Sequence, residues 1–148
     1  MPSTIGVIMV HIRCEPEAVF ATLRRLGDYS AWLPGSRTYD GTRDISDDPL
    51  VLGSTYRDRT PLGSMYGRVT ELDANRRISF LQATGNDWLS IAITYDLTAD
   101  GGATSVTRTG VITTRGPLAL IHPIVVRSTF AENRRTLDAL RAHLERAD

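Results

Sequence analysis

Residues 116–148 decide the fold, and they read GPLALIHPIVVRSTFAENRRTLDALRAHLERAD. A helix of about thirty residues would be about 45 Å long at 1.5 Å per residue. A helix of that length crosses a whole sheet, so we expect it to lie over a curved sheet and to enclose a cavity. Its apolar residues recur mostly at steps of three, four and seven, which puts them on one helical face: Leu118, Ile121, Val125, Phe130, Leu137, Leu140 and Leu144.

Pro123 interrupts this helical pattern, because proline lacks the backbone donor that a helix interior needs. We expect it to separate a short leading turn, which carries Leu118, Ile121 and His122, from a long segment running from Val125 to Leu144. The leading turn, with Trp32 opposite it, is where we expect a ligand to enter the cavity.

The preceding sequence predicts one strand, two short helices and six further strands. Ile5–Arg13 alternates apolar and polar residues, as a half-buried strand does. Pro16 begins a helix that should end near Gly27, and a second short helix is expected at 28–33. The six strands are expected near 37–44, 54–60, 65–72, 76–83, 88–97 and 103–113, and the short turns between the last four make neighbouring strands antiparallel. Strands and helices are segregated along the chain, which indicates an α+β fold.

Composition predicts one ordinary globular domain over residues 1–148, with 41% hydrophobic and 23% charged residues. A formal net charge of zero and the lack of a basic block argue against nucleic acid as a partner. No apolar run approaches the roughly eighteen residues that a membrane span needs.

The N-terminus does not read as a signal peptide and Cys14 has no second cysteine to pair with, so we expect a cytoplasmic protein. All 17 basic residues are arginine, which excludes lysine chemistry such as Schiff-base formation.

Several local motifs, in this order, resemble the START-like superfamily, also called SRPBCC or Bet v 1-like, and within it the polyketide cyclase/dehydrase and lipid transport branch. The motifs are EPEAVF at 15–20, YSAWLPG at 29–35, GSTYR at 53–57, GRVTELD at 67–73 and NRRTL at 133–137. The resemblance implies a helix-grip fold, in which a bent antiparallel sheet of about seven strands wraps around the long C-terminal helix, with two short helices after the first strand. It also implies a mostly apolar pocket between sheet and helix. Members of the superfamily include lipid carriers, hormone receptors, aromatases and cyclases.

The alternation of side chains along the predicted strands gives the residues that face this pocket. Each apolar member of the set could instead be ordinary core. The candidates for ligand binding are Trp32, Tyr56, Met65, Phe80, Ile91, Ile93, Tyr95, Arg108, Ile121, Val125 and Thr129.

Polar residues on the inward face are the candidates for chemistry. Asp58 and Arg108 share that face, and a buried charge needs a partner, so they could pair with each other or meet a polar group of the ligand. A register slip of one residue would instead put either side chain in solvent. Tyr56 is a further candidate, and His122 could carry protons at the pocket mouth or be an exposed histidine at the helix break.

No residue spacing predicts a metal site or a cofactor. The three histidines lie far apart in the sequence, and no nucleophile elbow, P-loop or dinucleotide fingerprint occurs. The leading hypothesis is therefore a monomer or homodimer that binds a small hydrophobic molecule, such as a lipid or polyketide. The alternative is a polyketide cyclase, aromatase or dehydratase that uses polar cavity residues as acid and base. A second alternative is a regulatory or stress-response interaction module.

Overall fold

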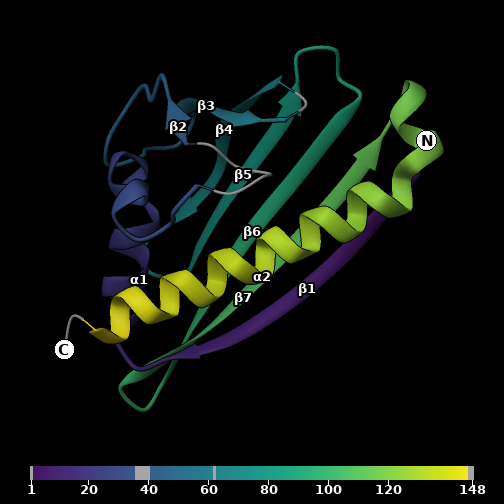
Figure 1. The fold of residues 1–148 in the computed structure, drawn as a ribbon. Helices are drawn as coiled ribbons and strands as arrows, with labels where there is room; N and C mark the ends of the chain where they lie inside the picture. The colour runs from purple at the N-terminus through teal and green to yellow at the C-terminus, as the bar shows by residue number, and fades with distance from the viewer. Residues whose placement is uncertain (1, 36–40, 62, 147–148) are drawn as a thin grey trace.

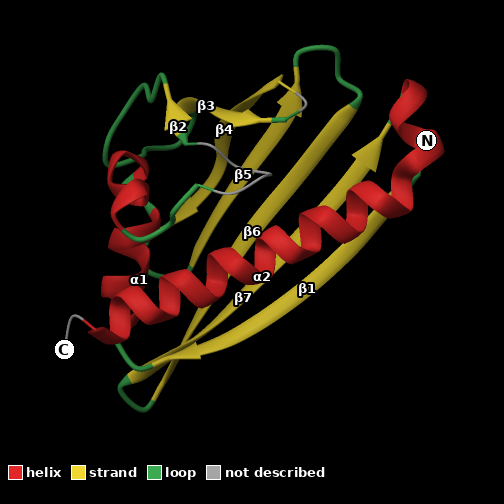
Figure 2. Cartoon of the chain, in the orientation of Figure 1, coloured by secondary structure: helices red, strands yellow, loops and turns green. Residues whose placement is uncertain are grey.

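The computed structural model describes residues 2–35, 41–61 and 63–146. Its seven strands form one antiparallel sheet in the order β1-β7-β6-β5-β4-β3-β2, and a long helix crosses the concave face of that sheet (Figure 1). The strands are β1 (Ser3–Ile12), β2 (Thr42–Arg43), β3 (Thr55–Thr60), β4 (Gly63–Asp73), β5 (Arg77–Thr84), β6 (Leu89–Asp100) and β7 (Ala103–Thr114). The helices are α1 (Pro16–Leu23), the 3-10 helices η1 (Leu26–Ala31) and η2 (Gly116–Ile121), and α2 (His122–Arg146). This arrangement confirms the predicted α+β helix-grip fold (Figure 2).

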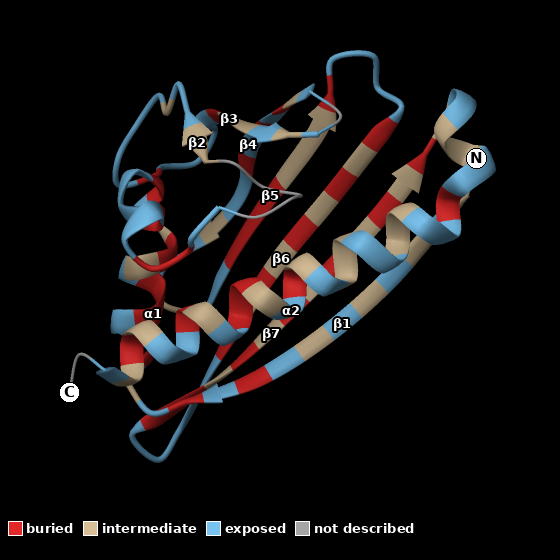
Figure 3. Cartoon of the chain, viewed as in Figure 1, coloured by how far each residue is buried: buried red, intermediate tan, exposed pale blue. Residues whose placement is uncertain are grey.

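The longest strand pair, β6–β7, is closed by a turn that only a flexible backbone can make. Gly101 and Gly102 have φ angles of +57° and +88°, which glycine adopts without steric cost. Two residues with positive φ between antiparallel strands match the right-handed twist of those strands. The turn pairs Asp100 with Ala103 and fixes the register of the whole hairpin. Buried and half-buried residues alternate along most of β6 and β7 (Figure 3).

Two glycines let α2 approach the sheet closely. Gly6 of β1 and Gly110 of β7 are paired across the strands. A side chain at Gly6 would overlap the Phe130 ring, and a Cβ at Gly110 would lie 3.3 Å from the Asn133 amide nitrogen. Because these two glycines have no side chains, α2 can lie close to the backbone of β1 and β7.

The helical pattern is interrupted next to Pro123, as predicted, but His122 belongs to the long helix and not to the leading turn. The 3-10 helix η2 ends at Ile121, and α2 begins at His122 with Pro123 in its first turn, where a missing backbone donor costs nothing. No helix in the described part of the chain has the length and apolar character needed to cross a bilayer.

The other predicted boundaries differ from the structure in small ways. The first short helix ends at Leu23 rather than near Gly27, and the second is a 3-10 helix that begins at Leu26. Of the expected strand at 37–44, the structure has the two-residue strand β2, while 36–40 lie outside the described residues. Strand β6 continues to Asp100, three residues beyond its predicted end.

Candidate functional site

A cavity of about 320 Å³ lies between the concave face of the sheet and α2. This volume lies within the range of small-molecule sites in proteins. The sheet contributes apolar side chains to its wall: Met65, Phe80, Leu89, Ile91 and Ile93. The apolar side chains of η2 and the start of α2 form one end: Leu118, Ile121, Ile124 and Val125.

Most of the residues predicted to face the pocket line this cavity. They do so because antiparallel pairing at the predicted register puts every second residue of β3, β4, β5, β6 and β7 on the concave face. The predicted residues that line it are Tyr56, Asp58, Met65, Phe80, Ile91, Ile93, Tyr95, Arg108, Ile121, Val125 and Thr129.

Trp32 does not join them in the cavity wall. Its ring is buried, lies 4.8 Å from the Tyr29 ring and stacks 6.2 Å from the His143 ring near the C-terminal end of α2. His143 is 21 residues beyond His122, so about 30 Å of helix separates it from the leading turn. The expected position of Trp32 opposite the leading turn is therefore wrong, because the 3-10 helix η1 packs against the other end of α2.

His122 also lies outside the cavity lining. Its side chain points to the sheet edge, where Nε2 is 2.7 Å from Thr4 Oγ1 and Nδ1 is 2.7 Å from Thr114 Oγ1. Both ring nitrogens are held by threonine hydroxyls and the residue is buried. The expectations that His122 faces the pocket mouth or is an exposed histidine are both wrong. It anchors the first turn of α2 to β1 and β7.

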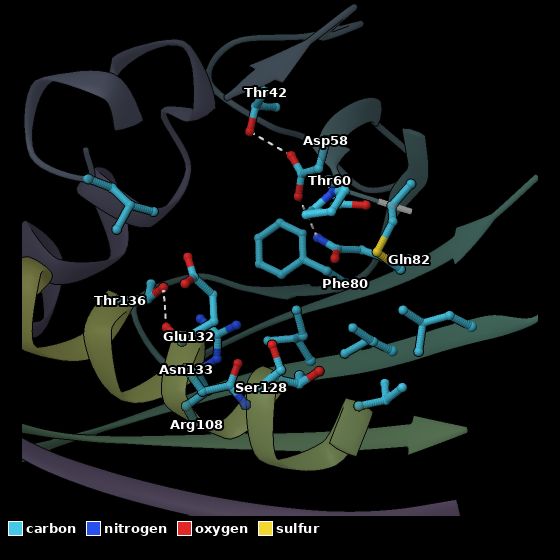
Figure 4. A pocket seen from close by; sticks show the side chains of 18 of the residues that line it. Thr42, Asp58, Thr60, Phe80, Gln82, Arg108, Ser128, Glu132, Asn133 and Thr136 are labelled. Atoms are coloured by element: carbon cyan, nitrogen blue, oxygen red, sulfur yellow. Dashed lines mark hydrogen bonds between the residues drawn. The ribbon is translucent and has the colours of Figure 1, made fainter. Parts of the chain in front are cut away.

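A hydrogen-bonded group occupies the cavity wall formed by β3 and β5. The Gln82 amide donates to Tyr56 Oη at 2.7 Å and to Asp58 Oδ2 at 3.1 Å, and Thr42 Oγ1 donates to Asp58 Oδ1 at 2.6 Å (Figure 4). Tyr56 fits here because Gly67 on the adjacent strand has no side chain. A Cβ at Gly67 would overlap the tyrosine ring.

Burial raises the pKa values of the two acidic side chains in this group, Asp58 and Tyr56. Removal from water raises the pKa of Asp58 to about 6, against an ordinary value of 3.8, although hydrogen bonds from Thr42 and Gln82 and the charge of Arg108 act in the opposite direction. Burial also raises the pKa of Tyr56, and the nearby Asp58 adds to that rise. A carboxyl group with a pKa near 6 can exchange a proton at neutral pH.

Arg108 projects from β7 into the same cavity. It is 7% exposed, its guanidinium donates a hydrogen bond to Tyr95 Oη, and its Cζ lies 5.0 Å from the centre of the Tyr95 ring. Its Nε is buried and has no hydrogen-bond partner among the described residues. Within residues 2–35, 41–61 and 63–146, no carboxylate lies within ion-pair distance of this guanidinium. Of the two possibilities for Asp58 and Arg108, a direct contact pair does not form, and Thr42 and Gln82 bind the carboxylate instead.

The sequence interpretation missed the polar side of α2. Four polar residues of the helix line the cavity at helical steps from Val125 and Thr129, so the 3.6-residue period was the available signal. They are Ser128, Glu132, Asn133 and Thr136. Apart from Thr129, the ligand-binding candidates on this helix were all apolar. Gln82 bridges Tyr56 and Asp58, and this role depends on how separate strands meet, so it is not visible in the sequence.

The described residues contain no group of three or more histidine, cysteine, aspartate and glutamate side chains that could hold a metal ion. The polar side chains that line the cavity are hydrogen-bond donors and acceptors. Asp58 and Arg108 are the charged pocket residues contributed by the sheet, and Glu132 is contributed by α2.

Comparison with known proteins agrees with this geometry. The family model described as polyketide cyclase / dehydrase and lipid transport matches residues 7–145. A protein from Thermus thermophilus has a similar structure, with a TM-score of 0.78 and 15% identity over 98% of this chain and 99% of that one. A START superfamily protein from Mycobacterium smegmatis gives a TM-score of 0.75 and 16% identity over 97% of this chain and 99% of that one. A protein of the dynemicin biosynthetic locus gives a TM-score of 0.68 and 17% identity over 97% of this chain and 48% of that one. A search of curated proteins found no match.

Proposed function

The chain belongs to the polyketide cyclase/dehydrase and lipid transport family, and on that premise we propose that it binds a small hydrophobic ligand, such as a lipid or polyketide, between the sheet and α2. The observation that carries this proposal is the cavity of about 320 Å³ beneath α2. Protein interiors are normally packed as densely as organic crystals, so a space of this size under a long helix needs an explanation. The binding of a small apolar molecule supplies one.

The residues expected to contact the ligand fall into two groups. Phe80, Ile91 and Ile93 provide apolar surface from the sheet, and Val125 and Thr129 face them from α2. The ligand would reach them past Ile121 and Ile124, which line the cavity and are 43% and 66% exposed. Apolar side chains that are both exposed and continuous with a cavity are typical of the mouth of a ligand site.

Native mass spectrometry of freshly purified protein, followed by extraction and identification of small molecules, tests the proposal. We expect a mass above that of the chain, and a hydrophobic compound in the extract. The control is Ile93→Trp, in which a larger side chain occupies part of the cavity and should reduce the amount of compound that copurifies. Equal amounts from both proteins would place the compound outside the cavity and contradict the proposal.

A second candidate function is the cyclisation, aromatisation or dehydration of a polyketide chain. The observation in its favour is Asp58, whose pKa of about 6 suits a group that removes and returns protons at neutral pH. Arg108 would polarise a carbonyl oxygen and Tyr56 would donate a hydrogen bond, whereas His122 has no part because it lies outside the cavity lining. On a substrate shown to turn over, Asp58→Asn should lower kcat by roughly a hundredfold or more. An unchanged kcat would exclude Asp58 as the acid or base.

The third class, an interaction module, predicts exposed apolar surface. Strand β1 has such a row on its outer face, where Ile5, Val7 and Met9 are 63–68% exposed. This row lies on the side of the sheet away from α2 and does not account for the cavity. We therefore place ligand binding first.

A further inference from the structure

We propose that the ligand is an apolar carboxylate, and that its negatively charged head is bound by Arg108 deep in the cavity while its apolar part extends along the sheet toward Ile121 and Ile124. This inference deepens the proposed function and rests on it, since it names the chemical class of the molecule that the same cavity binds.

The first observation is that Arg108 is buried with no counter-ion among the described residues. The residue is 7% exposed, and an arginine side chain stays charged at any pH at which proteins fold. A buried charge is costly unless an opposite charge and hydrogen bonds compensate it. Among the described residues, no carboxylate comes within ion-pair distance of this guanidinium. An anion supplied from outside the chain would provide the missing partner.

The unused donor of Arg108 is the second observation. One terminal nitrogen of the guanidinium donates to Tyr95 Oη, but Nε is buried and meets no acceptor in the described part of the chain. Guanidinium groups bind carboxylates through two parallel hydrogen bonds, one of which commonly comes from Nε. A ligand carboxylate at this edge of Arg108 would satisfy that donor.

The cavity carboxylates of the chain are engaged elsewhere. Asp58 accepts hydrogen bonds from Thr42 and Gln82. Glu132 forms a two-pronged ion pair with Arg135, at 2.5 and 3.1 Å. Neither carboxylate is placed to satisfy Nε of Arg108, so the position remains for a carboxylate that the described residues do not provide.

The surroundings of Arg108 suit a charged head attached to an apolar tail. Asn133 lines the cavity beside Arg108 and is 3% exposed, and its amide nitrogen can donate a further hydrogen bond (Figure 4). From Asn133 to Ile124 is nine residues, or about 13 Å along α2. The cavity side chains of the sheet along this path include Ile91 and Ile93, which suit hydrocarbon.

Competition against a neutral fluorescent probe tests the inference. The probe N-phenyl-1-naphthylamine is apolar and carries no charge, so its binding reports the cavity alone. Decanoate, 1-decanol and methyl decanoate would then displace it from the wild-type protein at pH 8 and constant ionic strength. The three competitors share an apolar chain and differ in their head group. We expect decanoate to displace the probe at a concentration about tenfold or more below that of the other two, as charge-assisted hydrogen bonds require.

Variants identify the residue responsible. In Arg108→Gln the preference for decanoate should disappear while the probe still binds. Arg134→Gln is the matched control, because Arg134 is an exposed residue of α2 and its loss changes the net charge by the same amount. That variant should keep the preference. Circular dichroism and thermal melting establish whether each variant is folded. If Arg108→Gln does not fold, the competition experiment on the wild-type protein still tests the preference for a carboxylate.

The outcomes separate the two proposals. Probe binding with equal displacement by all three competitors would overturn the carboxylate inference and leave the proposed function intact. A decanoate preference that survives in folded Arg108→Gln would also overturn it. If neither the probe nor decanoate binds the wild-type protein, both proposals fail.

Discussion

The Arg108 guanidinium donates a hydrogen bond to the Tyr95 hydroxyl and lies over the tyrosine ring, with Cζ 5.0 Å from the ring centre. The two residues face each other across the register of β6 and β7, so the hairpin itself brings them together. Both are buried, and both line the cavity. The hydroxyl and the aromatic ring of Tyr95 are modest partners for a full charge. Tyr95 therefore holds Arg108 in position, and none of the ion pairs among the described residues neutralises its charge.

This relationship predicts that Arg108 lowers the stability of the ligand-free protein. Arg108→Met removes the buried charge but leaves the Tyr95 hydroxyl without its partner, whereas Arg108→Met with Tyr95→Phe removes both polar groups. Replacing both partners with apolar groups of similar shape is often stabilising. We expect the double variant to exceed wild type in free energy of unfolding by about 1–3 kcal/mol in urea titrations of delipidated protein, with the single variant below the double. A double variant that is less stable than wild type would show that Arg108 is a structural residue.

Asp58 predicts a pH-dependent stability. The pKa of Asp58 is about 6 in the folded protein and ordinarily 3.8. Between these pH values the folded state therefore binds more protons than the unfolded state. The stability contributed by the protonated carboxyl is present below pH 4 and is lost as the pH rises through 6. Asp58→Asn should therefore be more stable than wild type by about 1–3 kcal/mol at pH 8, with the difference shrinking toward pH 4.

Urea titrations at several pH values measure this difference. The exposed Asp138→Asn, on α2, is the control for loss of one carboxylate. A gap between Asp58→Asn and wild type that stays constant from pH 4 to pH 8 would contradict the burial of Asp58 at the cavity wall.

The close contact between Gly67 and the Tyr56 ring predicts the effect of adding a side chain at position 67. A Cβ at this position would overlap the Tyr56 ring, whose hydroxyl accepts the hydrogen bond from Gln82. We expect Gly67→Ala to displace the ring, to cost about 1–3 kcal/mol of stability, and to weaken probe binding. Gly85→Ala is the control, because its Cβ would meet the Tyr66 ring at an ordinary 3.6 Å. Similar losses in both variants would show that the Tyr56 ring has room to move.

Enlarging one residue at the cavity and one in the packed core distinguishes empty space from filled space. Ile93 lines the cavity, whereas Ile78 on the neighbouring strand is completely buried and is not part of the cavity lining. Ile78→Phe should cost about 1–3 kcal/mol, because a filled core cannot accept extra volume. Ile93→Phe should change stability by less than about 1 kcal/mol, because the added atoms enter the cavity. Equal losses in thermal or urea unfolding would mean that the cavity is not available space.

The sequence predicted the parts of the site that depend on regular periodicity. Asp58 and Arg108 were placed on the inward face because the strand period is two and the turns are short, and the structure agrees. The long helix was predicted from the period of its apolar residues. The helix break at Pro123 was predicted because proline lacks the backbone donor that a helix interior needs.

The errors concern contacts that depend on how distant segments meet. His122 binds Thr4, which is 118 residues away in the chain, so its burial at the sheet edge has no local signal. Trp32 follows η1 to the C-terminal end of α2, and only the docking of that segment determines which end it meets. Asp58 met Thr42 and Gln82 rather than Arg108 because three strands converge at the carboxylate.

The most direct test of the account is a fluorescence titration of wild-type protein and Ile93→Trp with N-phenyl-1-naphthylamine. If the space between the sheet and α2 is a binding site for small apolar molecules, wild type will show saturable binding of one probe molecule per chain with a blue-shifted emission. The folded Ile93→Trp variant will then bind the probe at least about tenfold more weakly, because the indole takes the same space. Absence of saturable binding to wild type, or equal affinity in the two proteins, would contradict the assignment of this cavity as the binding site.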